Sequence, residues 1–138
     1  MTDWTKDSLQ GELDACPAIA FLKLSVQALD MEAKSVVFDM PMQPDVERAP
    51  GSGQFHGGPV ASLIDTAGDY AVALGVGGGV PTMNFRVDYI RPCTGPYLRA
   101  TATARRIGRT VAVADVDVHD EQGRLCAVGR GSYMSAIG

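Results

Sequence analysis

Residues 55–75 read FHGGPVASLIDTAGDYAVALG and carry the strongest periodic signal in the sequence. Pro59 suits a first helical turn, where its missing N–H has no intrahelical partner, and Gly75 suits a C-terminal stop. The pattern predicts one long central helix over residues 58–75. Apolar residues at the spacing of an amphipathic helix form its stripe: Val60, Leu63, Ile64, Ala67, Ala71 and Leu74.

The segments on both sides of this helix show the features of β-strands. Residues 24–29 and 35–40 predict a hairpin, since a polar stretch separates two β-like runs. After the helix, the apolar residues Met83, Phe85, Val87 and Tyr89 alternate with polar ones, which predicts a half-buried strand. Residues 98–105, 110–119 and 124–135 follow as further strands, joined by turns at Gly108 and residues 120–123. Residues 80–135 therefore predict a meander of four strands.

This order of elements defines an α+β fold, written (α)ββαββββ. One antiparallel sheet carries the long helix against a single face and curls around it. Short hairpin connections leave no room for βαβ crossovers, which argues against a doubly wound nucleotide-binding fold. Residues 4–15 predict a short polar helix within an N-terminal cover over residues 1–22. The 138 residues form one domain by the size of the chain.

Composition narrows the class of protein. The start of the chain lacks a basic region before an apolar core, no apolar run is long enough to cross a bilayer, and three scattered cysteines form no disulfide framework. We therefore expect a cytoplasmic protein without a membrane partner. The net charge of −4 argues against nucleic-acid binding. Residues 86–130 carry eight arginines against five acidic residues, which fits a nucleotide phosphate or, equally, the solvated outer faces of strands.

The sequence lacks the residues that several catalytic mechanisms require. The chain has two histidines and no G-x-S-x-G turn, which excludes an α/β-hydrolase. The glycines of residues 75–79 follow a helix rather than a strand, and no GxxxxGK[ST] motif occurs, so no phosphate-cradling loop is indicated. No spacing of His, Cys or carboxylate residues suggests a metal site.

The start of the central helix is the candidate site. Its first-turn N–H groups lack intrahelical partners and the helix dipole adds positive charge, so an oxyanion is favoured at Gly57 and Gly58. Asp65 shares one face with Ser62 and Asp69 and lies two turns inside the helix, too deep for a cap. Spacing alone leaves Asp65 open as a solvated carboxylate, and His56 as a loop residue that satisfies backbone groups.

The same segment resembles the PaaI-like acyl-CoA thioesterases, which are hotdog-fold enzymes with the pattern H-G-G-x-x-x-x-L-x-D. Leu63 and Asp65 fall at the last two named positions of this pattern. The resemblance continues through TMNFRVDYIRP (residues 82–92), RIGRT (106–110) and GRGSYM (129–134), and covers about residues 40–138.

The resemblance implies hydrolysis of an acyl-CoA to free acid and CoA. The Gly57 N–H would polarise the thioester carbonyl, and Asp65 of the facing subunit would activate water or attack directly. His56 would orient the carbonyl end, and Thr82 matches the position of a water-positioning hydroxyl. The resemblance further implies a homodimer, or a homotetramer of two dimers, without metal or redox cofactor, because CoA belongs to the substrate.

The groups that bind the nucleotide part of the substrate vary within this family. The candidates in this chain are Gln54, Phe55, Gly58, Asn84, Arg86, Arg91, Gly108 and Arg109, with the arginines and the Gly108 turn assigned to the CoA phosphates. Many relatives carry asparagine six residues before the histidine, where this chain has Pro50, and Gln54 is the candidate substitute. Two alternatives stay open: a hotdog hydratase acting on enoyl- or hydroxyacyl-thioesters, and a non-catalytic acyl-CoA-binding protein.

Overall fold

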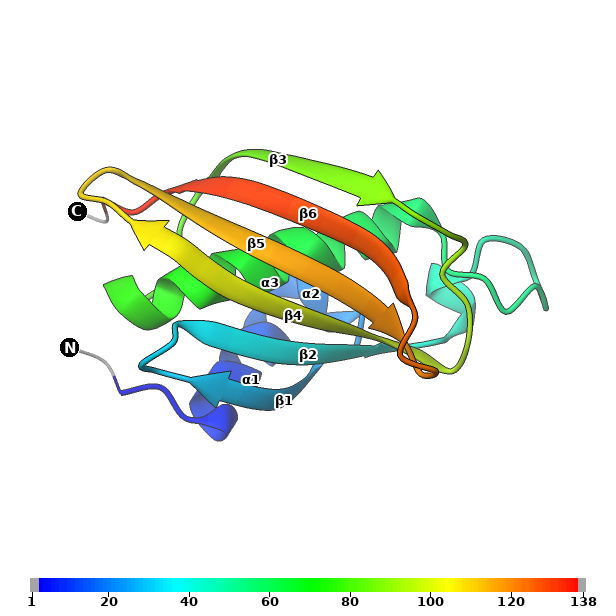
Figure 1. Cartoon of the computed structure of the whole chain (residues 1–138). Coiled ribbons are helices and arrows are strands. Elements are labelled where there is room, and N and C mark those ends of the chain that lie inside the picture. Colours follow the sequence, from blue (N-terminus) through cyan, green and yellow to red (C-terminus); the bar gives the residue numbers. More distant parts are fainter. Residues whose placement is uncertain (1–2, 137–138) are drawn as a thin grey trace.

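The computed structural model describes residues 3–136, so residues 1, 2, 137 and 138 of the predicted domain lie outside it. Six strands form one antiparallel sheet that curves around the long helix α3 (Figure 1). This is the α+β hotdog architecture predicted from the sequence. The helices are α1 (Lys6–Ala15), α2 (Pro17–Ala20), the 3-10 turn η1 (Pro44–Val46) and α3 (Gly57–Val76). The strands are β1 (Ser25–Asp30), β2 (Ser35–Pro41), β3 (Thr82–Tyr89), β4 (Tyr97–Ile107), β5 (Val111–Asp120) and β6 (Leu125–Met134).

Helix α3 is one residue longer at each end than predicted. All six residues of its apolar stripe are buried, with at most 1% of any of them exposed. The predicted stop at Gly75 is wrong, because the helix continues to Val76 and is capped by Gly77, whose left-handed φ of 97° favours glycine. Gly75 instead provides space, since a Cβ there would lie 2.4 Å from Ile107 Cδ1 at the end of β4.

The sheet order is β1-β2-β4-β5-β6-β3, which corrects the predicted meander of four strands. β4, β5 and β6 do form a meander, and β1 and β2 form the predicted hairpin. β3, however, pairs with β6 and not with β4. The alternation of apolar and polar residues identifies a strand and its faces, but it does not identify the neighbouring strand.

β3 is consequently an edge strand with an exposed apolar side. Met83, Phe85 and Tyr89 are 56%, 38% and 51% exposed, so the prediction of a half-buried strand is wrong for the single chain. Arg86 and Asp88, on the opposite face, line a polar groove with Thr101 and Thr103 of β4. Phe85 and Tyr89 alternate with Arg86 and Asp88, so they lie on the face that carries α3 but extend beyond what α3 covers.

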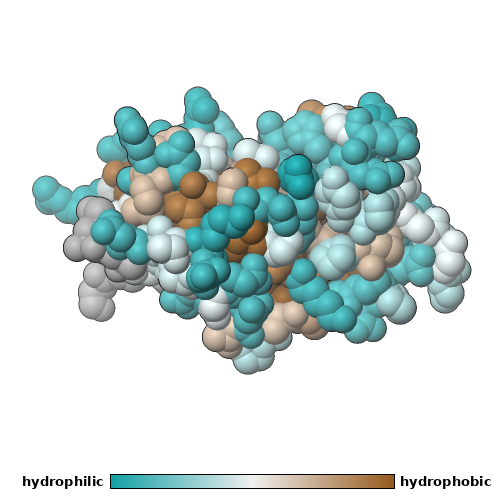
Figure 2. Space-filling model, turned by 90° about the horizontal axis from the view of Figure 1, so that it is seen from below, coloured by the Kyte–Doolittle hydropathy of each residue, from teal (hydrophilic) through white to brown (hydrophobic). Residues whose placement is uncertain are grey.

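The N-terminal helices cover the β1–β2 end of the sheet, on the side that carries α3 (Figure 1). Leu9 and Leu13 of α1, four residues apart on one face of the helix, are buried. The Gln10 side chain joins α1 to the chain entering β1, because it donates to Leu24 O and accepts from Val26 N–H, both at 2.8 Å. Figure 2, which shows the molecule from below the view of Figure 1, has hydrophobic side chains exposed between hydrophilic ones. Among the described residues no helix is long and apolar enough for a bilayer crossing.

Two glycines allow the sheet to approach the middle of α3. A Cβ on Gly68 of α3 or on Gly131 of β6 would lie 2.3 or 2.4 Å from the Tyr133 hydroxyl oxygen. This space admits the Tyr133 ring, and its hydroxyl donates to the backbone carbonyl of Asp65 at 3.1 Å. The helix turn that carries Asp65 is thus fixed against β6.

Candidate active site

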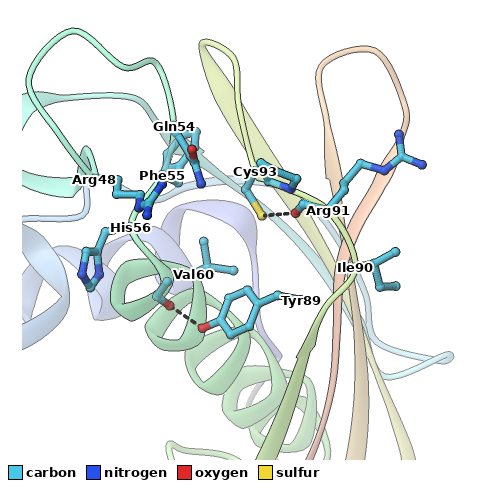
Figure 3. A pocket seen from close by; sticks show the side chains of 11 residues that line it. Arg48, Gln54, Phe55, His56, Val60, Tyr89, Ile90, Arg91 and Cys93 are labelled. Atoms are coloured by element: carbon cyan, nitrogen blue, oxygen red, sulfur yellow. Dashed lines mark hydrogen bonds between the residues drawn. The ribbon is translucent and has the colours of Figure 1, made fainter.

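A cavity of about 460 Å³ opens at the start of α3 (Figure 3). Phe55, His56 and Gly57 line it on the helix side, and residues after β3 line it on the other. Backbone hydrogen bonds hold the approach to the helix, from Phe55 N to Cys93 O and from His56 N to Val46 O, both at 2.8 Å. The remaining lining residues are Arg48, Gln54, Val60, Tyr89, Ile90, Arg91, Pro92 and Cys93.

The first turn of α3 leaves one amide free for a ligand. His56 is the N-cap, and its Nδ1 accepts from the Gly58 N–H at 2.9 Å. The Gly57 N–H has no hydrogen-bond acceptor within residues 3–136, as expected for a first-turn position. Tyr89 donates its hydroxyl to the Gly57 carbonyl at 2.5 Å, which ties the helix start to β3 (Figure 3). Gly57 is therefore the amide that can bind an oxyanion.

Two arginines flank this cavity from opposite sides, Arg48 and Arg91 (Figure 3). Neither forms an ion pair with any described residue. Cys93 also lines the cavity, but burial raises its pKa to about 12, so the thiol is protonated at neutral pH and is not a nucleophile. The cavity offers positive charge and an amide donor.

Asp65 lines a second cavity, of about 180 Å³, between α3 and the N-terminal helices. Its Oδ1 accepts from the Thr82 hydroxyl at 2.7 Å, a distance typical of a hydrogen bond to a carboxylate. Leu13 and Ile19 supply apolar walls, and Tyr70 and Asp69 complete the side formed by α3. An oriented carboxylate therefore stands beside a small, partly apolar space.

Asp69 lies one turn beyond Asp65 and lines the same cavity. Its Oδ1 accepts from the Val80 N–H at 2.9 Å. Burial raises the pKa of Asp69 from 3.8 to about 6; the Val80 N–H opposes this rise and the charge of Asp65 adds to it. Asp69 therefore loses its proton near pH 6, at a higher pH than most carboxyl groups do.

We expect Asp69→Asn to gain stability relative to the parent as the pH rises from 4 to 7. The folded carboxyl keeps its proton up to about pH 6, whereas the unfolded one loses it near 3.8, so the parent loses stability across this window. The loss amounts to at most about 3 kcal/mol, and asparagine avoids it. Thermal unfolding of both proteins at several pH values measures this, and a constant difference in Tm would contradict it.

The structure brings several predicted site residues together. Gln54, Phe55, His56, Gly57 and Arg91 line the first cavity, and Gly58 caps the adjacent helix start. Asp65 and Thr82 meet at the second cavity.

Other predicted residues lie elsewhere. Arg86 pairs with Asp88 on the face of the sheet away from α3, and Asn84 shares that face by strand alternation. Gly108 and Arg109 form the β4–β5 turn, next to Ile107, which contacts Gly75 near the C-terminal end of α3. Within one chain these four residues are therefore separate from both cavities. Pro50, at the family's asparagine position, is exposed in a turn.

Arg48 and Tyr89 are among the residues of the first cavity that the sequence did not indicate as site residues. Arg48 lies in a loop rich in proline and glycine, where no periodicity indicates its direction. Tyr89 belongs to the apolar set of β3 and was interpreted only as packing. The sequence signal that could have identified Tyr89 is a tyrosine at the end of a strand, beside a segment that returns to the start of a helix.

The antiparallel sheet around α3 is a hotdog fold, in which a free glycine amide at the helix start and an oriented aspartate two turns later form the candidate site of a thioester hydrolase. A family model for the thioesterase superfamily matches residues 52–127, more than half of the chain. The chain belongs to the thioesterase superfamily.

Known proteins support this assignment along most of the chain. A candidate esterase of Halobacterium salinarum is 35% identical over 136 residues, covering 91% of this chain and 88% of its own. The medium/long-chain acyl-CoA thioesterase YigI of Escherichia coli K12 is 42% identical over 53 residues, covering 38% of this chain and 34% of its own. The structure of the Escherichia coli PaaI protein, from the phenylacetic acid degradation operon, superimposes with a TM-score of 0.80 at 27% identity, covering 98% of this chain and 93% of PaaI. The predicted resemblance to PaaI-like thioesterases is confirmed.

Proposed function

We propose that the protein hydrolyses an acyl-CoA or arylacyl-CoA thioester to the free acid and CoA. One observation carries the proposal: α3 bears a free amide at Gly57 and, eight residues later, a carboxylate oriented by the Thr82 hydroxyl. The similarity to the acyl-CoA thioesterase YigI supports the choice of CoA as the thiol. The hydrolysis uses no metal or separate cofactor, since CoA is part of the substrate.

The spacing on α3 supports a site shared by two chains. Eight residues of helix separate Gly57 from Asp65 by about 12 Å along the axis. Reacting groups must approach within about 3–3.5 Å. The Gly57 amide and the Asp65 carboxylate of one chain are therefore too far apart to act on one carbonyl, and we assign the partner carboxylate to a second copy.

The edge strand β3 supports such a pairing. It ends the sheet, so its outer N–H and C=O groups are available to another strand. Its exposed apolar side chains, Met83, Phe85 and Tyr89, would be buried by a second copy, which favours association. We propose a homodimer as the active unit and a homotetramer of two dimers as its larger form.

The chemistry follows from these two groups. The Gly57 N–H donates to the carbonyl oxygen and stabilises the negative charge that develops there. Asp65 of the facing protomer accepts a proton from the attacking water, or attacks the carbonyl carbon itself and is released by water. In either route the carbon–sulfur bond breaks, and the sulfur leaves as the CoA thiol after it takes up a proton.

Each of the two cavities suits a different part of the substrate. Arg48 and Arg91 offer positive charge near the Gly57 amide, which suits the phosphate groups of CoA. The space beside Asp65, with Leu13, Ile19 and Tyr70 in its wall, suits an acyl group. Three free cysteines fit a reducing compartment, which supports the cytoplasm as the proposed location.

The position of His56 supports a thioesterase better than it supports a hydratase. A hydratase of this fold needs a histidine deep in the acyl tunnel with a carboxylate partner. His56 is exposed, and its Nδ1 accepts from the Gly58 amide rather than bonding to a carboxylate.

A panel of acyl-CoA thioesters of different chain length and aromatic content tests the function. We expect stoichiometric release of free thiol and free acid from at least one of them, because the oriented carboxylate can activate water. Free thiol is measured colorimetrically, and the acyl products by mass spectrometry. Formation of hydroxyacyl-CoA without thiol would identify a hydratase instead, and saturable binding without either product would identify a binding protein.

A further inference from the structure

The connector between α3 and β3, residues 77–81, is attached to α3 by Asp69. The carboxylate accepts from the Val80 N–H, and the Val80 side chain is buried in a cluster with Val72 and Tyr133. Pro81 continues the attachment, since its carbonyl accepts from Met134 N–H at 2.9 Å. The next residue, Thr82, begins β3.

These contacts link the two aspartates of α3 through the connector. Asp65 and Asp69 lie on adjacent turns and face the same cavity. Asp69 holds Val80, and two residues later the Thr82 hydroxyl donates to Asp65. The connector begins with three glycines, which restrict the backbone little. Its position must therefore come from attachments such as the one to Asp69.

We propose that Asp69 is a positioning residue for thioester hydrolysis: by fixing the Val80 amide, it holds the Thr82 hydroxyl in place against the Asp65 carboxylate. The inference rests on the proposed function, in which Asp65 acts on the substrate. Asp69 lines the cavity beside Asp65, but it neither activates the water nor attacks the carbonyl. Its effect reaches the carbonyl through the direction of the Asp65 oxygens.

The charge of Asp69 offers a second way to observe this role. The titratable groups that face it are Asp65 and Tyr70 of α3, Tyr133 of β6 and Cys16 at the start of α2. Burial raises the pKa of Tyr70 to about 12 and raises that of Tyr133 further above its ordinary value, so both stay protonated below pH 8. Protonation of Asp69 near pH 6 weakens its bond to the Val80 N–H, because a neutral acceptor is weaker than a carboxylate.

The experiment combines Asp69→Ala, Asp69→Asn and Thr82→Val in the full chain. We expect Asp69→Ala to lower kcat about 10-fold with little change in KM, as loss of a hydrogen bond to a charged group would. Asn retains an oxygen that can accept the Val80 N–H, although more weakly than a carboxylate does, so kcat of Asp69→Asn at pH 7 is expected to lie between those of Asp69→Ala and the parent. Asp69→Ala with Thr82→Val is expected to be no slower than Thr82→Val alone, because both changes remove the same contact.

Asp30→Ala is the matched control. Asp30 Oδ1 accepts the N–H groups of Glu32 and Ala33 in the β1–β2 turn, so its removal breaks the same kind of hydrogen bond at a residue that lines neither cavity. It is expected to lower Tm without changing kcat. A loss of kcat in the double variant equal to the product of the two single losses would overturn the proposal, as would an unchanged kcat in Asp69→Ala.

The pH profile keeps the proposal testable if Asp69→Ala does not fold. We expect kcat of the parent to decline from pH 7 to pH 5 more steeply than kcat of Asp69→Asn, which has no charge to lose. Parallel profiles would overturn the proposal. A parent that releases no thiol from any acyl-CoA would instead reject the proposed function, so the two failures are distinguishable.

Discussion

Asp65→Asn is expected to lose thioester hydrolysis by about 100- to 10 000-fold, the range that a positioned acid or base contributes. Asparagine has the same shape and can still accept from the Thr82 hydroxyl, so the fold and the cavity persist. It can neither take a proton from water nor attack the carbonyl. Initial rates of thiol release at saturating acyl-CoA measure the loss.

Substrate binding separates a chemical defect from a structural one. Asp65→Asn should bind a non-hydrolysable thioether analogue of the best acyl-CoA as tightly as the parent does, since Gly57, Arg48 and Arg91 are unchanged. The Tm should stay within a few degrees. Asp45→Asn, a change of the same chemical group on the exposed surface, serves as control and should keep full activity. Turnover by Asp65→Asn at the parent's rate would eliminate the proposed mechanism.

Gly57→Pro is expected to lower kcat about 100- to 1000-fold, the usual effect of removing one oxyanion donor. Proline removes the N–H and is well tolerated at the first position of a helix. The preceding residue, His56, has φ −65° and ψ 146°, a conformation that a following proline favours. The reaction should therefore lose a donor while the helix start is retained.

Gly57→Ala is the matched control, because it adds a Cβ and keeps the N–H. A Cβ at this position lies 3.3 Å from the Tyr89 hydroxyl oxygen, so alanine and proline crowd the same atom. Alanine should cost far less than proline in kcat. Equal losses in the two variants would show that crowding, and not the amide, limits the reaction.

The two inactive proteins also test the shared site. In a mixed dimer of Asp65→Asn and Gly57→Pro chains, one site combines an intact Gly57 with an intact Asp65. Random exchange of equal amounts should restore about a quarter of the parent activity, because half of the dimers are mixed and each has one good site. No recovery, with chain exchange confirmed by native mass spectrometry of differently tagged chains, would contradict the arrangement across protomers.

The long helix and the faces of most strands could be predicted because burial leaves a periodic record in the residues. The stripe from Val60 to Leu74 is an example, and every member of it is buried. The identity of the neighbouring strand leaves no such pattern, so the sequence predicts a meander that includes β3, whereas β3 pairs with β6. The end of α3 was similarly open, since several glycines follow Leu74 and only the backbone angle at Gly77 distinguishes the true stop.

The same distinction applies to the residues of the candidate site. His56, Gly57 and Asp65 belong to one helical segment, so a short motif suffices to find them. The bond from Thr82 to Asp65 depends on a flexible connector and on the irregular register at the start of β3, and neither follows from spacing. Arg86 was a candidate for CoA phosphates by charge alone, whereas its strand directs it away from α3 towards Asp88.

The distance between Gly57 and Asp65 along α3 also bears on how activity first appears after synthesis. In the proposed dimer, a newly made chain carries two half-sites and cannot complete either by itself. Its acquisition of activity would then follow the meeting of two chains rather than the folding of one. In a cell that makes this enzyme at low abundance, hydrolysis would begin only after a delay set by the rate at which two chains meet, and thioesters would persist during that delay.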